Sequence, residues 1–407
     1  MTTNSSSYYI EKENKYGAHN YHPLPVVLER GEGIFVWDVE GKRYYDFLSA
    51  YSAVNQGHCH PRIVEALRAQ VSRLALTSRA FYNNLLGEWE EYMHQLFGYD
   101  RMLPMNSGAE GVETALKLCR KWAYKVKGIP QNEAKIVVCK ENFHGRTITI
   151  VSMSSDPDSY GGYGPFTPGF IQIPFNDPAA LENALQDKNV AGFLVEPIQA
   201  EAGVNVPDDG YLKQVSALCK KYGVLFIADE IQTGLARTGK MLACDYDEVR
   251  PDVLILGKAL SGGTYPVSCV LANDDIMLTI RPGEHGSTYG GNPVAAAVAI
   301  ASLQVIKDEQ LAENAAKMGA IFRNEIKAIP SELIEIVRGK GLLNAVAIRS
   351  DFPKSAWDIC LKMKENGIIA KPTHEHIIRF TPPLVINEAQ MADAIGRIKK
   401  SFAEMGI

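Results

Sequence analysis

Two chemically reactive side chains directly follow apolar runs in the middle of the chain. Asp229 ends the run 224–229 (VLFIAD), and Lys258 follows 254–257 (LILG) at the start of a glycine-rich turn. Apolar runs of this length with β-branched residues are typical of buried parallel strands. Because ligands of open α/β sheets bind at the carboxyl ends of the strands, we expect Asp229 and Lys258 to face one crevice.

This pair has the chemistry that a protein must supply to pyridoxal phosphate (PLP). A lysine that is partly removed from water loses proton affinity, so Lys258 would become an amine nucleophile suited to a Schiff base. Asp229, at the neighbouring strand end, would hold the protonated nitrogen of a pyridine ring. The plainer alternative is a solvated lysine and a capping Asp229–Glu230 pair, which is the usual role of such residues after a strand.

A phosphate site is predicted at residues 107–110 (SGAE), which have the capping-box pattern of a helix start. The free N–H groups of a helix N-terminus attract anions, and Gly108 and Ala109 are small enough to let a phosphate approach. A capping box alone usually has only a structural role. The segment 285–293 is a second candidate because its hydroxyls and glycines suit a phosphate or a subunit contact, although an ordinary loop is the default.

Strands and helices alternate between the first helix and about residue 275, which predicts a mostly parallel, doubly wound α/β sheet. The expected strands are 135–139, 192–197, 224–229, 253–257 and 267–272. A helix should begin near Pro61, with a buried stripe of Ile63, Leu67, Val71 and Leu74. We divide the chain into an N-terminal segment with a hairpin (1–60, beginning with a mobile tail), a large PLP-binding α/β domain (61–309) and a smaller α+β domain (310–407).

The composition argues against several classes of function. The chain has 407 residues, of which 46% are hydrophobic and 22% charged, as in ordinary soluble enzymes. A net charge of -5 without a basic run argues against nucleic acid as a partner, and the longest apolar stretch, 294–306, is too short to span a membrane. Seven scattered cysteines without a CxxC motif indicate reduced thiols and no metal site. We expect a cytoplasmic protein, with the mitochondrial matrix as the alternative if a presequence has been removed.

The chain carries the sequence blocks of a known family. The blocks that resemble the signatures of class III, fold-type I, PLP-dependent aminotransferases are 229–234 (DEIQTG), 257–263 (GKALSGG) and 286–293 (GSTYGGNP). The blocks that resemble the branch transferring the δ-amino group of L-ornithine to 2-oxoglutarate are 16–21 (YGAHNY), 51–61 (YSAVNQGHCHP) and 338–343 (RGKGLL). The resemblance implies a homodimer with shared active sites.

The resemblance also implies which residues hold PLP. Lys258 would carry the cofactor and move the proton, and Asp229 would pair with the pyridine nitrogen. Phe143 would contact the ring face, and Gln232 would contact the phenolic oxygen. Gly108 and Ala109 would hold the phosphate, and Thr288 would reach the phosphate of the neighbouring subunit. Without the family blocks, core packing for Phe143 and a helix-start hydrogen bond for Gln232 are simpler alternatives.

Two different acids must bind in turn, and the resemblance implies a switchable charge. Arg379 would be masked by Glu201 while ornithine is bound and released for 2-oxoglutarate, because an unpaired arginine beside ornithine is costly. Arg146 and Tyr21 would grip the ornithine α-carboxylate, and Tyr51 would disfavour reaction at the α-amine. The structural alternative for Glu201 and Arg379 is a surface salt bridge worth at most about 1 kcal/mol.

One departure from the family and one histidine leave questions open. Residues 199–203 read QAEAG, whereas the family usually has QGEAG; if that glycine has a positive φ, Ala200 is strained and restricts Glu201. His144 would either stack beside the ring or merely fill space.

Two other functions remain as alternatives. One is a class III ω-aminotransferase that acts on N-acetylornithine or 4-aminobutyrate. The other is a PLP-binding protein without catalysis.

Overall fold

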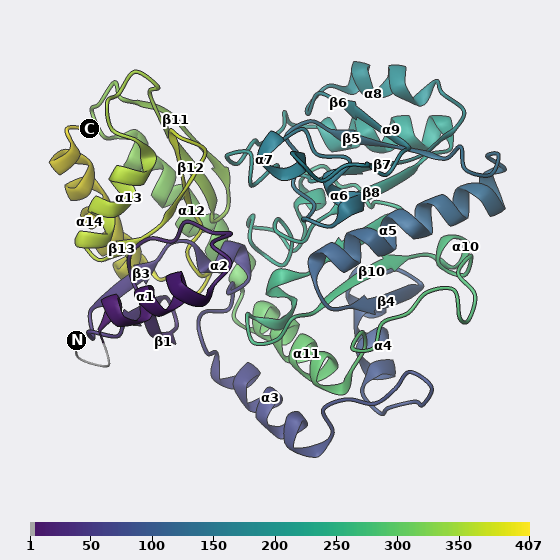
Figure 1. Ribbon diagram of the computed structural model, residues 1–407, viewed down its shortest axis with the longest axis horizontal. Coiled ribbons are helices and arrows are strands. Elements are labelled where there is room, and N and C mark those ends of the chain that lie inside the picture. The colour runs from purple at the N-terminus through teal and green to yellow at the C-terminus, as the bar shows by residue number, and fades with distance from the viewer. Residues whose placement is uncertain (1–4) are drawn as a thin grey trace.

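The computed structural model describes residues 5–407, and a seven-stranded sheet forms its centre (Figure 1). The strands lie in the order β4-β10-β9-β8-β7-β5-β6. Their bounds are β4 Arg101–Met105, β5 Lys135–Cys139, β6 Phe170–Ile173, β7 Val190–Val195, β8 Leu225–Asp229, β9 Val253–Leu256 and β10 Ser268–Ala272. From β9 to β6 every pairing is parallel, and β10 pairs antiparallel with both of its neighbours, β9 and β4. The predicted strands and the mostly parallel sheet are confirmed.

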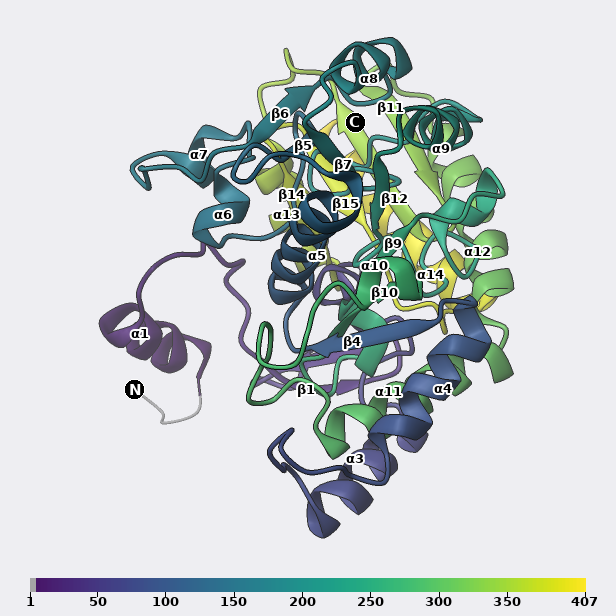
Figure 2. The same cartoon turned by 90° about the vertical axis from the view of Figure 1, so that its right-hand side faces the viewer.

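Every residue of the inner strands β7, β8, β9 and β10 is buried, which is why they read as apolar runs. Helices pack on this sheet and around its β4 edge (Figures 1 and 2). Their bounds are α3 Pro61–Arg73, α4 Leu86–Phe97, α5 Gly108–Trp122, α6 Ile148–Val151, α7 Pro157–Tyr160, α8 Pro178–Leu185, α9 Tyr211–Tyr222, α10 Asp274–Met277 and α11 Pro293–Asp308. A π-helical turn, Ala123–Lys127, extends α5 to Gly128, and 3₁₀ turns span Ala243–Tyr246 and Lys258–Ser261.

A second sheet joins the two ends of the chain. Its order is β1-β2-β3-β13, and β13 pairs parallel with β3. The bounds are β1 Leu28–Glu32, β2 Phe35–Asp38, β3 Arg43–Asp46 and β13 Ile368–Ile369, so the predicted hairpin is confirmed and gains a C-terminal neighbour.

A third, antiparallel sheet has the order β11-β12-β15-β14. Its strands are β11 Ile334–Lys340, β12 Leu343–Ile348, β14 Lys371–Thr373 and β15 Ile377–Phe380. The accompanying helices are α12 Leu311–Lys327, α13 Ala356–Glu365 and α14 Glu388–Met405, which form one lobe with the second sheet (Figure 1).

Two expectations about helices were wrong in part. The expected mobile tail contains helix α1, Ser6–Tyr16, which is capped by Ser5 and held by Glu40 through the backbone and hydroxyl of Ser6. Because α1 buries no residue, its sequence has no apolar stripe to reveal it, and Figure 2 shows it standing away from the body. In α3, Ile63 is buried as expected, but Val71 is 51% exposed and Leu74, just after the helix, 41% exposed.

No helix among residues 5–407 has both the length and the apolar character needed to cross a bilayer.

Candidate active site

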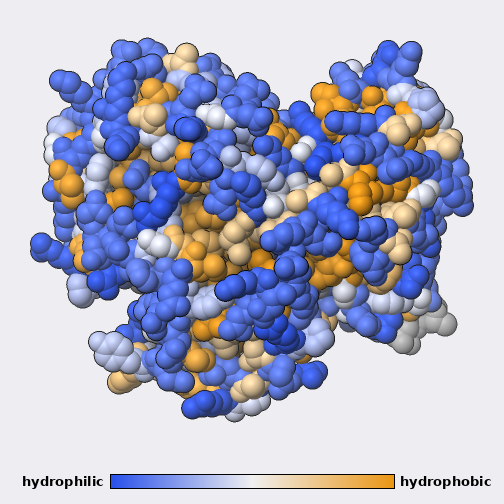
Figure 3. Space-filling model, turned by 180° about the vertical axis from the view of Figure 1, so that it is seen from behind, coloured by the Kyte–Doolittle hydropathy of each residue, from blue (hydrophilic) through white to orange (hydrophobic). Residues whose placement is uncertain are grey.

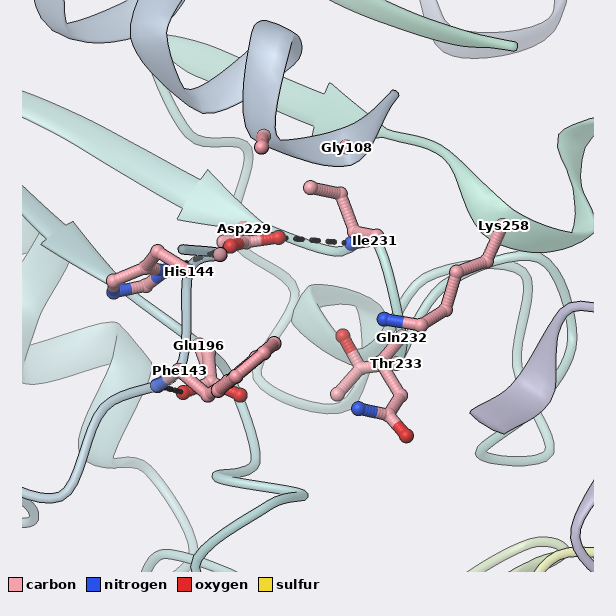
Figure 4. Close-up of a pocket in the computed structure, with 11 residues that line it drawn as sticks. Gly108, Phe143, His144, Glu196, Asp229, Ile231, Gln232, Thr233 and Lys258 are labelled. Carbon is pink, nitrogen blue, oxygen red and sulfur yellow. Dashed lines mark hydrogen bonds and ion pairs between the residues drawn. The ribbon is translucent and has the colours of Figure 1, made fainter. Parts of the chain in front are cut away.

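A cavity of about 220 Å³ opens at the carboxyl ends of β5, β7, β8 and β9 (Figure 4). Its lining residues are Gly108, Ala109, Phe143, His144, Gly145, Glu196, Asp229, Ile231, Gln232, Thr233 and Lys258. The expectation that Asp229 and Lys258 face one crevice is therefore confirmed. Five other residues singled out in the sequence also line this cavity: Gly108, Ala109, Phe143, His144 and Gln232.

Lys258 stands at the start of the 3₁₀ turn after β9, with a left-handed φ of 43°. Its side chain points into the cavity, and its Nζ has no hydrogen-bond or ion-pair partner among the described residues (Figure 4). Burial lowers the pKa of Lys258, an effect that the charges of Glu201 and Asp229 only partly oppose. A larger fraction of this amine is therefore unprotonated at neutral pH than in an ordinary lysine, as a nucleophile requires.

Asp229 is held on both carboxylate oxygens. Its Oδ1 accepts the Ile231 N–H at 3.1 Å, and its Oδ2 accepts His144 Nδ1–H at 2.7 Å. Burial alone would lower the pKa of His144, but the hydrogen bond and charge of Asp229, with the charge of Glu196, raise it. His144 therefore does not merely fill space: it orients Asp229 and places positive charge beside that carboxylate.

The phosphate end has the predicted capping box. Ser107 Oγ accepts the Glu110 N–H at 3.2 Å, and Glu110 Oε2 accepts the Ser107 N–H at 2.8 Å. Gly108 packs so closely on Ile231 that an added Cβ would lie 3.1 Å from the Ile231 Cδ1. The N-terminus of α5 therefore approaches the cavity through its backbone, as an anion site requires.

Glu196, which the sequence analysis did not single out, is a buried wall of the cavity. Its Oε1 accepts the Phe143 N–H at 2.8 Å, and its Oε2 lies 3.5 Å from the Ala200 N–H. Burial raises the pKa of Glu196 to about 7, while the charge of His144 opposes this. Glu196 directly follows β7 and lies level with Asp229, the last residue of β8, because Val195 pairs with Ala228. This position at the carboxyl end of a buried strand is the signal that could have found it.

Arg379 and Glu201 form a pair at 2.6 Å beside the cavity. The Arg379 side chain is only 2% exposed and that of Glu201 26%, so the surface salt-bridge alternative is wrong. Burial would raise the pKa of Glu201, but the charge and hydrogen bond of Arg379 outweigh it and lower the pKa. Gln232 Nε2 donates to the same Glu201 oxygen at 3.1 Å and links the pair to the cavity wall. Within residues 5–407, Arg379 Nε is buried without a partner, which leaves one donor for a ligand.

Ala200 does not have a positive φ, so the strain considered for it does not arise. The left-handed residues of this segment are Gly203, with φ 99°, and Val204, with φ 59°.

Tyr51 lies in a strained turn. Ser49, Ala50, Tyr51 and Ser52 all have φ between 47° and 70°. The left-handed conformation costs a non-glycine residue roughly 1–2 kcal/mol, so this turn persists only because its surroundings hold it. Asp46 Oδ1 accepts the Leu48 and Ser49 N–H groups at 2.8 and 2.9 Å. Backbone strain of this kind is concentrated at functional sites.

Three predicted residues are exposed and do not line the cavity. Arg146 is exposed, with its guanidinium carbon 5.8 Å from the centre of the Phe143 ring. Tyr21 is 69% exposed. Thr288 is also exposed, on a loop fixed by a hydrogen bond from Asn106 Nδ2 to Ser287 Oγ. Thr288 therefore does not reach the cavity of its own chain, and its predicted contact to a neighbouring subunit stays a prediction.

The residues present fit PLP. An unpartnered amine, a carboxylate held by two donors, an aromatic side chain and a helix N-terminus all border one cavity. These groups match the aldehyde, ring nitrogen, ring face and phosphate of the cofactor, respectively.

Comparisons with known proteins agree with this chemistry. The family model for class-III aminotransferases matches residues 16–402. The chain is 65% identical to the ornithine aminotransferase, mitochondrial, of Drosophila melanogaster over 97% of this chain and 91% of that protein. The ornithine aminotransferase structure from Toxoplasma gondii, described with partial occupancy of PLP, matches with a TM-score of 0.98 at 50% identity, covering 100% of this chain and 96% of that chain.

The acetylornithine aminotransferase structure from Elizabethkingia anophelis matches with a TM-score of 0.90 at 61% identity, covering 98% of this chain and 99% of that chain. Since these matches extend over nearly the whole chain, they include all three sheets and the residues that line the cavity. The chain therefore belongs to the class III aminotransferases, the fold-type I enzymes that use PLP.

Proposed function

We propose that the protein is an ornithine δ-aminotransferase. It transfers the δ-amino group of L-ornithine to 2-oxoglutarate, giving glutamate and glutamate 5-semialdehyde, which cyclises to pyrroline-5-carboxylate. The observation that carries the proposal is the buried Glu201–Arg379 pair, because a carboxylate that can mask or release an arginine suits alternating substrates. The names of the Drosophila and Toxoplasma relatives support the same substrate.

Bound PLP supplies an aldehyde for amine exchange and a ring that accepts electrons from the substrate carbon. Lys258 takes the proton from the ornithine δ-carbon and returns it, a role that its lowered pKa favours. Asp229, oriented by His144, would keep a positive charge on the ring nitrogen. Phe143 would contact the ring, and Gln232 would donate a hydrogen bond to the phenolic oxygen. The N–H groups of Gly108 and Ala109 would hold the phosphate.

Substrate contacts come from the outer side of the cavity. Arg146 and Tyr21 bind the α-carboxylate of ornithine, which directs its δ-amine toward Lys258. Glu201 masks Arg379 in this half of the reaction and turns away when Arg379 binds the α-carboxylate of 2-oxoglutarate. Bidentate binding of a carboxylate is the contact for which a guanidinium is best suited.

The active protein would be a homodimer in which Thr288 reaches the phosphate bound by the partner. A band of apolar side chains across the middle of one face supports a covered surface there (Figure 3). Residues 1–60, 61–309 and 310–407 would be its structural units. Its seven cysteines are unpaired and six are buried, which supports a reducing compartment, either the cytoplasm or the mitochondrial matrix.

The deciding experiment adds ornithine, N-acetylornithine and 4-aminobutyrate in turn to the PLP-loaded protein and follows the cofactor spectrum. Rapid conversion to the amine form with ornithine, and slow conversion with the other two, is expected. N-acetylornithine is the important competitor because of the Elizabethkingia relative. The proposal would be refuted if the cofactor spectrum changed fastest with N-acetylornithine, or if none of the three compounds changed it.

A further inference from the structure

Lys371 is a third cation on the substrate side, beside Arg379. It lies in β14 directly opposite Arg379 in β15, and directly opposite residues of an antiparallel pair project from the same face. Lys371 Nζ donates to the Tyr51 hydroxyl at 2.9 Å. It also lies 5.5 Å from the centre of the Tyr51 ring and 5.6 Å from that of Tyr21. The ammonium is therefore held between the two tyrosines on which substrate binding is proposed to depend.

Lys371 and Arg379 are both cations, but they differ in whether a carboxylate is paired with them. Arg379 is neutralised by Glu201 at 2.6 Å, whereas Lys371 has no ion-pair partner in the part of the chain that the structure describes. Lys371 therefore leaves a full positive charge at the outer end of the site.

Lys371 also anchors Tyr51. The backbone of Tyr51 is fixed in the left-handed turn by its neighbours, but its half-buried side chain has one hydrogen-bond partner among residues 5–407, Lys371 Nζ. Loss of this hydrogen bond would free the hydroxyl end of the side chain, while the turn itself would keep the support of Asp46.

We propose that Lys371 determines which end of ornithine reacts. With the δ-amine at Lys258, the outer end of ornithine carries both the α-carboxylate and the α-ammonium, so it is neutral overall. With the α-amine at Lys258, the outer end carries only the δ-ammonium, which the Lys371 charge repels. Lys371 thus disfavours the reversed orientation directly and also positions Tyr51. This inference rests on the proposed function.

The two orientations give different products. Transfer of the δ-amino group leaves glutamate 5-semialdehyde, which loses water on closing to pyrroline-5-carboxylate. Transfer of the α-amino group leaves 5-amino-2-oxopentanoate, which loses water on closing to pyrroline-2-carboxylate. In both cases the nitrogen passes to 2-oxoglutarate and appears as glutamate, so glutamate counts turnovers and the ratio of the cyclic products reports orientation.

The test compares Lys371→Met, Lys371→Gln, Lys371→Arg and Tyr51→Phe with the wild-type PLP-loaded enzyme. Lys371→Met should raise KM for ornithine about tenfold, lower kcat less than about threefold and raise the share of pyrroline-2-carboxylate at least about tenfold. Lys371→Gln should change the product ratio in the same way, whereas Lys371→Arg should keep the ratio close to that of the wild type. Adding Tyr51→Phe to Lys371→Met should raise KM by less than the product of the two single effects, because both remove one hydrogen bond.

Lys188→Met is the matched control, because Lys188 is exposed and lies just before the amino end of β7, whereas the cavity lies at the carboxyl ends of the strands. An unchanged KM and product ratio in folded Lys371→Met and Lys371→Gln would overturn the inference. If the wild-type enzyme itself does not convert ornithine, the proposed function fails, which is a different result.

Discussion

The cofactor side and the substrate side of the active site are built in different ways. Asp229, Glu196 and His144 are all buried beyond or at the carboxyl ends of β8, β7 and β5, which are neighbouring strands. Hydrogen bonds of 2.7–3.1 Å join Asp229 to His144 and to the Ile231 N–H, and Glu196 to the Phe143 N–H. The substrate side takes Tyr21, Tyr51, Arg146, Glu201 and Arg379 from five separate segments, and two of them are exposed.

The difference follows from what each side must do. The ring nitrogen and the phosphate of PLP stay the same in both halves of the reaction, so rigid groups in the core can bind them throughout. The substrates alternate between one and two carboxylates, so their site needs a charge that can be masked. Substitutions on the cofactor side should therefore change kcat or stability, and those on the substrate side should change KM and specificity.

The largest effect is expected from Lys258→Ala. This variant loses the amine that is proposed both to carry the cofactor and to move the proton, so kcat with ornithine and 2-oxoglutarate should fall at least about a thousandfold. Circular dichroism should be unchanged, since Lys258 has no hydrogen-bond or ion-pair partner among residues 5–407. Lys188→Ala is the control, and turnover above a hundredth of wild type in Lys258→Ala would contradict the role of Lys258.

Glu196→Gln tests how the burial of a carboxyl group on the cofactor side changes the free energy of unfolding with pH. Because the folded pKa of Glu196 is raised from 4.5 to about 7, the unfolded chain loses this proton first as pH rises. The wild-type protein should therefore lose about 3 kcal/mol of unfolding free energy between about pH 4.5 and pH 7, and the variant should not. Denaturant unfolding of both proteins at several pH values measures this. Parallel stability curves would show that Glu196 ionises normally in the fold.

Glu201→Gln should separate the two half-reactions. The variant cannot neutralise Arg379, so ornithine should react roughly tenfold more slowly while KM for 2-oxoglutarate falls or stays unchanged. Single-turnover measurements of each half-reaction check this. Glu325→Gln, which breaks the exposed pair with Lys399, is the control, and equal losses in both half-reactions would refute a masking role.

The smallest effect is expected from Tyr21→Phe. Tyr21 is 69% exposed, so loss of one hydroxyl contact to the substrate should raise KM for ornithine only about threefold and leave stability unchanged. Steady-state kinetics beside Tyr16→Phe, a tyrosine that is 74% exposed on α1, gives the comparison. A large change in kcat would place Tyr21 nearer the reacting carbon than its exposure indicates.

The cofactor side was largely predictable from the sequence, because Asp229 and Lys258 directly end apolar runs whose burial the composition reveals. Glu196 directly follows an apolar run in the same way but was missed, because the predicted strand 192–197 extended past it to Pro197. The partner of His144 could not be predicted, because the hydrogen bond to Asp229 joins residues 85 positions apart.

The substrate side depends more on tertiary structure. The family resemblance named Tyr51 and Arg379, but no periodicity predicts four left-handed residues without glycine, as at 49–52. Lys371 was not singled out because its role comes from cross-strand pairing and a contact 320 positions away. Helix α1 was not predicted for a different reason: it has no buried face, so its sequence lacks the apolar periodicity by which helices are predicted.

The parallel pairing of β13 with β3 bears on how the protein is made. Tyr45 meets Ile368, a neighbour that the ribosome adds more than 300 residues later. At typical translation rates that delay is on the order of 15–60 s, during which the hairpin has an open edge available to a chaperone or to another nascent chain. Arg379 emerges later still, so a growing polypeptide contains every group expected to bind the vitamin before it contains the guanidinium expected to bind 2-oxoglutarate.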